Sequence, residues 1–126
     1  MKEEKENFYK TIKQVYCPCL KNYIYFTSDG FHHLLYKPSG RARKLKERIY
    51  KLQLLPLVIP VIKNTKGIDE YKTEKVKISR KKNALPENIE YWALIERVGK
   101  KNTRVKVIII KKERGGKIIF WSVMKP

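Results

Sequence analysis

The chain has 126 residues, 42% of them hydrophobic, so it is long enough to fold around one core and is not a disordered basic tail. Lys and Arg number 30 against 12 Asp and Glu, which gives a formal net charge of +18 at pH 7. The longest apolar run, from Leu54 to Ile62, contains two prolines and is too short to cross a bilayer. Because the first residues are charged and lack a secretory h-region, we expect a single cytoplasmic domain over residues 1–126 with no membrane partner.

The first third is predicted to contain two helices and a strand. Phe8, Ile12 and Val15 lie at helical spacing and predict an amphipathic helix over Lys2 to Val15. The aromatic and β-branched run Tyr23 to Thr27 predicts a short strand. A second, short helix is expected after Ser28-Asp29-Gly30, with one buried stripe made of Phe31, Leu34 and Leu35.

The clearest helical period in the chain runs through Leu45, Ile49, Leu52, Leu55, Val58, Ile59 and Ile62. Pro56 and Pro60 cannot lie in the middle of a straight helix, so we expect a break near Leu54 and Leu55, with Pro56 starting a second short helix. The polar segment 64–88 follows, in which Val76 and Ile78 alternate and predict one weak edge strand.

Three strands are predicted in the last third, over Ile89 to Val98, Thr103 to Lys112 and Lys117 to Met124, with GKKN and ERGG as turns. The middle and last strands are apolar at nearly every position, so helices should cover both faces in part. The sequence therefore predicts an α+β fold of N-terminal helices packed on an antiparallel β-meander of about four strands.

The two histidines, His32 and His33, open the second predicted helix and point about 100° apart. If Phe31, Leu34 and Leu35 face the core, His32 stacks with Tyr36, while His33 and Lys37 form a pair at the edge. An imidazole beside a cation suits proton transfer to or from a ribose hydroxyl or a leaving oxygen. An ordinary surface or capping histidine is the alternative.

A row of basic residues, Arg41, Lys44, Arg48 and Lys51, recurs at helical spacing opposite the leucine face. Such a row can bind phosphate and stabilise the extra charge of a phosphorane, although the solvated face of any amphipathic helix looks the same. In the predicted meander, Tyr91 and Arg97 share a face with Lys106 and could stack a base and bind phosphate, while Trp92 and Leu94 share the other face with Val105 and Val107. Ser122 either hydrogen-bonds a substrate phosphate or fills space under a helix.

The sequence shows no metal-binding or cofactor-binding pattern. Cys17 and Cys19 are too close for an unstrained disulfide, and two thiolates do not complete a zinc site, so they are interpreted as structural or incidental. There is no phosphate-binding glycine loop and no carboxylate cluster for Mg²⁺. If the chain cleaves nucleic acid, it therefore does so without metal, which requires the 2′-hydroxyl of RNA as the nucleophile.

The order of YIYFTSDGFHHLL, RARKLKERIYKLQLLPLVIPVI, YWALIERV, RVKVIII and KIIFWSVM resembles the small phage- and mobile-element-associated members of the barnase, EndoU, colicin and RelE ribonuclease superfamily. The resemblance implies metal-independent RNA cleavage, commonly as a toxin held in check by an acidic antitoxin or immunity protein. It places the catalytic site at His33, Arg41, Arg43, Arg48 and Ser122 and adds Tyr91 and Lys106. The residue patterns described above add Lys37, Lys44, Lys51 and Arg97 as substrate-binding or assisting residues.

The sequence thus predicts a cytoplasmic endoribonuclease that needs no cofactor and binds RNA. Two alternatives use the same basic surface: a non-catalytic nucleic-acid-binding protein, and a mobile-element adaptor that binds an acidic protein. A solvated lysine-rich surface without a polyanionic partner is a further interpretation of the +18 charge.

Overall fold

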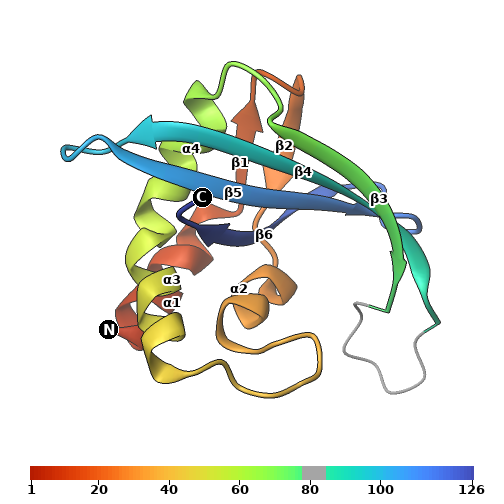
Figure 1. Ribbon diagram of the computed structural model, residues 1–126, viewed down its shortest axis with the longest axis horizontal. Coiled ribbons are helices and arrows are strands. Elements are labelled where there is room, and N and C mark those ends of the chain that lie inside the picture. The colour runs from red at the N-terminus through yellow and green to blue at the C-terminus, as the bar shows by residue number, and fades with distance from the viewer. Residues whose placement is uncertain (78–84) are drawn as a thin grey trace.

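The computed structural model describes residues 1–77 and 85–126 and shows helices packed on a sheet of six strands (Figure 1). In chain order the elements are α1 (Lys2–Ile12), β1 (Gln14–Cys17), β2 (Asn22–Tyr25), α2 (Ser28–Leu35), α3 (Leu45–Leu54), the 3₁₀ helix η1 (Leu55–Leu57), α4 (Val58–Asn64), β3 (Glu70–Val76), β4 (Glu87–Val98), β5 (Thr103–Lys112) and β6 (Ile118–Met124). None of the helices described is long and apolar enough to cross a membrane.

The strand order across the sheet is β1-β2-β6-β5-β4-β3. The C-terminal strands β4, β5 and β6 form the expected antiparallel meander, and Gly99–Asn102 makes the turn between β4 and β5. The α+β class is confirmed, and β3, β4, β5 and β6 together form an antiparallel meander of four strands, but the whole sheet is larger than predicted and mixed. The sheet has six strands, and β2 runs parallel to β6 through the pairs Ile24 to Ile118 and Tyr25 to Ile119.

The N-terminal hairpin contains β1, the one described strand that the sequence did not predict. Lys13 has a φ of 58°, a left-handed conformation that ends α1. The chain then continues as β1, where Val15 and Cys17 alternate with exposed neighbours. The prediction of a helix up to Val15 is wrong because Val15 fits both the helical period of the preceding residues and the alternation of a four-residue strand.

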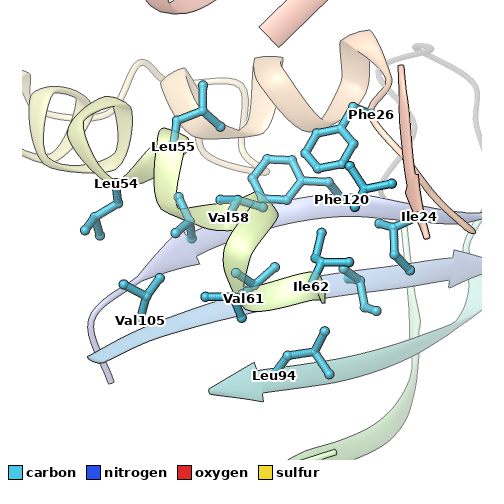
Figure 2. Close-up of a cluster of buried hydrophobic side chains, with 14 of the residues drawn as sticks. Ile24, Phe26, Leu54, Leu55, Val58, Val61, Ile62, Leu94, Val105 and Phe120 are labelled. Atoms are coloured by element: carbon cyan, nitrogen blue, oxygen red, sulfur yellow. The ribbon is translucent and has the colours of Figure 1, made fainter. Parts of the chain in front are cut away.

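The main core lies between the sheet and the helical segment α3-η1-α4 (Figure 2). As predicted, the helix breaks at Leu55, Pro56 lies at the start of η1, and α4 follows. Val58, Val61 and Ile62 of α4 are fully buried against β4 and β5, which contribute Leu94 and Val105. Burying such side chains is worth about 1.5–3 kcal/mol each, so this contact fixes the helical segment on the sheet.

The chain between α2 and α3 is extended. Tyr36 pairs with Ala42 in an isolated bridge, and the loop turns at Gly40, whose φ is 89°. Because α3 begins at Leu45, Arg41 and Lys44 do not belong to a helical row, and Leu45 is 63% exposed instead of buried as predicted. The predicted edge strand is present as β3, which includes Val76, whereas Ile78 lies outside the described residues.

Candidate functional site

A β-bulge in β6 gives two consecutive side chains to one face of the sheet. Ile108 pairs with Ser122, whereas Ile109 pairs with Phe120, so Trp121 is the extra residue. Phe120 belongs to the core under the helices, while Trp121 packs in a second cluster on the opposite face. Ser122 shares that opposite face, because side chains paired across two strands point to the same side.

The helix α2 brings His33 onto this face. Phe31, Leu34 and Leu35 are buried as predicted, and the His33 ring stacks on Trp121 with a centroid separation of 4.3 Å and an interplanar angle of 19°. Gly30 permits this close approach, because a Cβ at that position would lie 2.4 Å from the Phe120 carbonyl oxygen. His33 is therefore held by packing as well as by hydrogen bonds.

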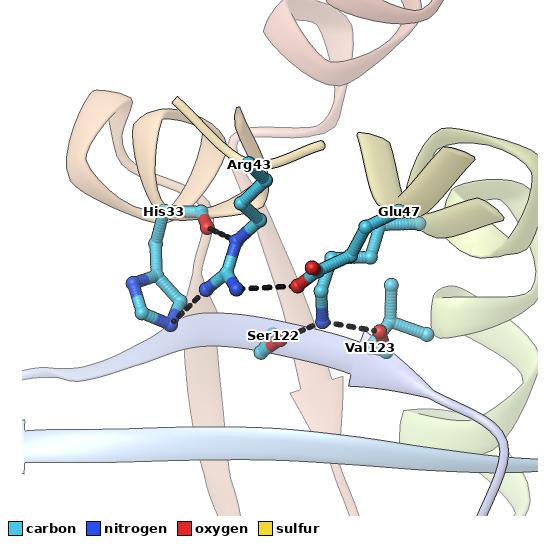
Figure 3. Close-up of polar contacts among 6 residues, drawn as sticks. His33, Arg43, Glu47, Ser122 and Val123 are labelled. Carbon is cyan, nitrogen blue, oxygen red and sulfur yellow. Dashed lines mark hydrogen bonds and ion pairs between the residues drawn. The ribbon is translucent and has the colours of Figure 1, made fainter. Parts of the chain in front are cut away.

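Arg43 ties α2 to α3 by three contacts (Figure 3). Its Nε donates to the His33 carbonyl oxygen at 2.9 Å, its Nη1 contacts Glu47 Oε1 at 2.6 Å, and its Nη2 lies 3.3 Å from His33 Nε2. A guanidinium can only donate, so this last contact makes Nε2 the acceptor and places the ring proton on Nδ1. Arg43 thus orients the imidazole.

Lys51 reaches from α3 to the bulge in β6. Its Nζ donates to Ser122 Oγ at 2.9 Å and to the Val123 carbonyl oxygen at 3.2 Å. Lys51 is 6% exposed and Ser122 is 3% exposed, so the predicted placement of Lys51 in a solvent-facing row is wrong. Ser122 is buried, as its interpretation as a space-filling residue expects, and its hydroxyl accepts from Lys51, while its contact with a substrate phosphate stays a prediction.

Burial and neighbouring charges shift both titratable groups of the site. Burial, reinforced by Arg43, Lys51 and His32, lowers the pKa of His33 to about 4. Burial and Arg43 lower the pKa of Lys51 to about 8, with Glu47 acting in the opposite direction. At pH 7, His33 is therefore a neutral acceptor, whereas most Lys51 side chains carry a proton to donate.

These side chains line a cleft of about 450 Å³ that extends across the sheet to β3. Lys72 lies 5.0 Å from the centroid of the Tyr91 ring, and Lys106 donates to Glu70 at 3.0 Å. The register pairs Ile95 with Lys106, Leu94 with Val107 and Glu96 with Val105, so the predicted division of β4 and β5 into two faces is confirmed. The cleft thus combines cations, aromatic rings and a proton acceptor.

The fold brings together six of the residues singled out in the sequence: His33, Arg43, Lys51, Tyr91, Lys106 and Ser122. Five others do not line the cleft: Lys37, Arg41, Lys44, Arg48 and Arg97. Lys37 follows the end of α2 and is exposed, so its predicted pairing with His33 along a helix is wrong. Arg97 instead contacts the Asn102 carbonyl oxygen at the β4-β5 turn. The predicted stacking of His32 on Tyr36 is confirmed at 4.5 Å.

Three side chains that line the cleft or contact its residues were not singled out in the sequence: Glu47, Lys72 and Trp121. The apolar pattern of β6 marked Trp121 as buried but carried no sign of the bulge that aims it at His33. Lys72 lies in the lysine-rich segment 64–88, where nothing distinguished it from its neighbours. Glu47 lies four residues after Arg43, a spacing that favours an ion pair and could have been noticed.

Among residues 1–77 and 85–126, no three His, Cys, Asp or Glu side chains are grouped to hold a metal ion. Cys17 and Cys19 are free thiols, and burial raises the pKa of Cys17. Comparisons of the chain with protein-family models, curated proteins and solved structures find no match.

Proposed function

We propose that the chain is a metal-independent endoribonuclease and that the cleft beside β6 is its active site. The observation that carries the proposal is that His33 and Lys51 line the same cleft and have pKa values of about 4 and about 8. Groups whose environments push their pKa values apart are suited to act as base and acid near neutral pH.

The chemistry requires a proton acceptor, a proton donor and charge stabilisation. Neutral His33 accepts the proton of a ribose 2′-hydroxyl, whose oxygen attacks the adjacent phosphorus. Its Nε2 is held by Arg43 at 3.3 Å, the long end of a hydrogen bond, so a substrate hydroxyl can replace that contact. Protonated Lys51, positioned by Ser122, donates to the leaving 5′-oxygen, and the bond from phosphorus to that oxygen breaks.

The products are a 2′,3′-cyclic phosphate on one fragment and a 5′-hydroxyl on the other. Arg43 has two N–H groups beyond its three protein contacts, and they can stabilise charge on the pentacoordinate phosphorus. Farther along the cleft, Lys72 and Lys106 can bind neighbouring phosphates, and Tyr91 can stack a base. Their ion pairs with Glu74 and Glu70 involve exposed carboxylates and are weak enough for phosphate to displace.

The sequence resemblance supports the same proposal, since it implies an RNA-cleaving site that includes His33, Arg43 and Ser122. With it come two further proposals: that the protein acts in the cytoplasm as a toxin or mobile-element effector, and that an acidic antitoxin or immunity protein restrains it. A cleft lined by four cations would be the natural contact for such a partner.

The deciding experiment incubates total cellular RNA with purified protein in excess EDTA and analyses the fragment ends. We expect cyclic phosphate ends from the wild type, and at least a 100-fold loss of rate in Lys51→Met and in His33→Ala. Lys66→Met is the matched control, because Lys66 is exposed and outside the cleft. Circular dichroism verifies that each variant is folded.

Two results would instead support the alternatives. Intact RNA with the wild type, together with salt-sensitive RNA binding, would indicate a non-catalytic nucleic-acid-binding protein. Binding to an acidic protein without any binding to RNA would indicate an adaptor.

A further inference from the structure

A second cavity, of about 570 Å³, lies between α1 and α2 beside the end of β2. It is distinct from the cleft, because α2 separates the two: His32 lines the cavity, whereas the adjacent His33 lines the cleft. Its volume is in the range of small-molecule binding sites. None of the chemistry proposed for the cleft uses it.

The charges around the cavity favour an anion. Lys2, Lys10 and Lys13 line it, and Glu6 is the one acidic residue in the described lining, which leaves a surplus of two positive charges. All three lysines come from α1 or the residue that follows it. The negative group of a ligand would therefore be held on the α1 side.

The opposite side of the cavity favours an aromatic ring. His32 and Tyr36 stack nearly parallel, with 4.5 Å between centroids and an angle of 17°. Tyr25, Phe26 and Phe31 also contribute to the lining. Flat side chains of this kind bind nucleobases by stacking, whatever the base.

One residue of the lining, Thr27, has a buried hydroxyl group. Its Oγ1 atom has no hydrogen-bond partner among the described residues. The neighbouring Tyr9 hydroxyl, by contrast, is satisfied, because it donates to the Thr27 carbonyl oxygen. An unpaired buried hydroxyl is costly, and a polar ligand atom would relieve that cost.

We propose that this cavity is a nucleotide-binding site. The base stacks against His32 and Tyr36, the phosphate binds the lysines of α1, and a polar atom of the nucleotide pairs with Thr27. The site does not depend on catalysis in the cleft. Its occupant is either a free mononucleotide or one nucleotide of an RNA chain, since both present the same base and phosphate.

Calorimetric titration with AMP and with a short oligodeoxyadenylate tests the proposal. The oligonucleotide lacks the 2′-hydroxyl, so cleavage cannot interfere. Lys10→Ala combined with Lys13→Ala should weaken binding about tenfold, the loss expected for charged hydrogen bonds. The control is Lys100→Ala with Lys101→Ala, which removes the same charge from the exposed β4-β5 turn outside the cavity.

The variant Thr27→Val distinguishes a role of this hydroxyl in nucleotide binding from a role in stability. The hydroxyl has no partner in the free protein, so its removal should weaken nucleotide binding severalfold without lowering the melting temperature. A purely structural threonine would give the reverse pattern. Binding of AMP would identify a free nucleotide, whereas binding of the oligonucleotide alone, with the same dependence on these variants, would identify a nucleotide of a chain.

Three results would overturn the proposal. The first is that neither ligand binds. The second is that binding is lost in the cleft variant Lys51→Met but unchanged in the Lys10 and Lys13 pair. The third concerns polyglutamate, titrated as a model of an acidic protein. If it alone binds, and its binding requires Lys10 and Lys13, the cavity would be assigned to an acidic protein.

Discussion

At the scale of single residues, the site depends on two shifted pKa values that make opposite demands on pH. The proposed cleavage mechanism requires neutral His33, which is available above its pKa of about 4, and protonated Lys51, which is available below its pKa of about 8. The rate, measured as kcat/KM, should therefore rise with pH through about 4, stay level, and fall above about 8.

The alkaline limb identifies the acid. Lys51→Met should remove the fall above pH 8 along with most of the rate, while the matched control Lys66→Met should keep both limbs. A wild-type profile that rises through pH 6.5, the ordinary value for histidine, would contradict a buried His33 acting as the base.

The lowered pKa of His33 also predicts how the stability of the protein depends on pH, without any RNA present. Its pKa is lower in the folded protein than in the unfolded chain, so the unfolded chain binds a proton first as the pH falls. The free energy of unfolding should therefore be constant above about pH 6.5 and fall by about 3 kcal/mol between there and pH 4. Urea unfolding at pH 4, 5 and 7 measures the loss, and His33→Gln should flatten the profile over that interval.

A candidate residue could be identified from the sequence where its type stands out from its neighbours. His33 and Ser122 were identifiable because a histidine and a lone hydroxyl stand out in apolar surroundings. Lys51 was predicted to face solvent, but it is buried, and its ammonium group reaches Ser122 and Val123. Helical spacing shows on which side of the helix a lysine begins, but it does not show where its long side chain ends.

At the scale of elements, the contact between α2 and β6 determines where His33 lies. Gly30 sets their separation, and a Cβ there would also meet the Tyr9 hydroxyl at 2.7 Å. Gly30→Ala should therefore destabilise the protein by about 3 kcal/mol, the upper range for overpacking. Thermal unfolding measures this, with Gly67→Ala as the control, because a Cβ at Gly67 would meet nothing within 4 Å. Equal melting temperatures for the two variants would contradict the close packing.

Elements marked by one clear hydrophobic period or by a local turn signal could be predicted. Features that depend on contacts with other segments of the chain could not. The break at Pro56 and the β4-β5 hairpin follow from local chemistry, namely a proline and a glycine turn. Strand β1 forms a local hairpin with β2, and it was missed because Val15 also fits the helical period of the residues before it. The parallel pairing of β2 with β6 depends on contacts between residues nearly a hundred positions apart. The bulge at Trp121 depends on tertiary packing in the same way, so the face of Ser122 could not be fixed in advance.

At the scale of the whole molecule, most of the positive charge lies outside the cleft. The chain carries a net charge of +18, whereas the cleft is lined by four cations: Arg43, Lys51, Lys72 and Lys106. The wider charge should speed association with any polyanion, and the cleft should determine where the RNA is held. Salt dependence distinguishes the two contributions, because only phosphates in contact release counterions on binding.

If those four cations each neutralise one phosphate, the logarithm of affinity for single-stranded RNA should fall with the logarithm of salt concentration with a slope of about −3. Lys72→Ala with Lys106→Ala should reduce that slope by about 1.4. Lys63→Ala with Lys66→Ala, which changes the net charge equally outside the cleft, should leave it unchanged. A 2′-O-methylated oligonucleotide avoids cleavage during the titration. Equal slopes for the two double variants would mean that RNA is held by the general charge of the surface, and the cleft would lose its assignment as the binding site.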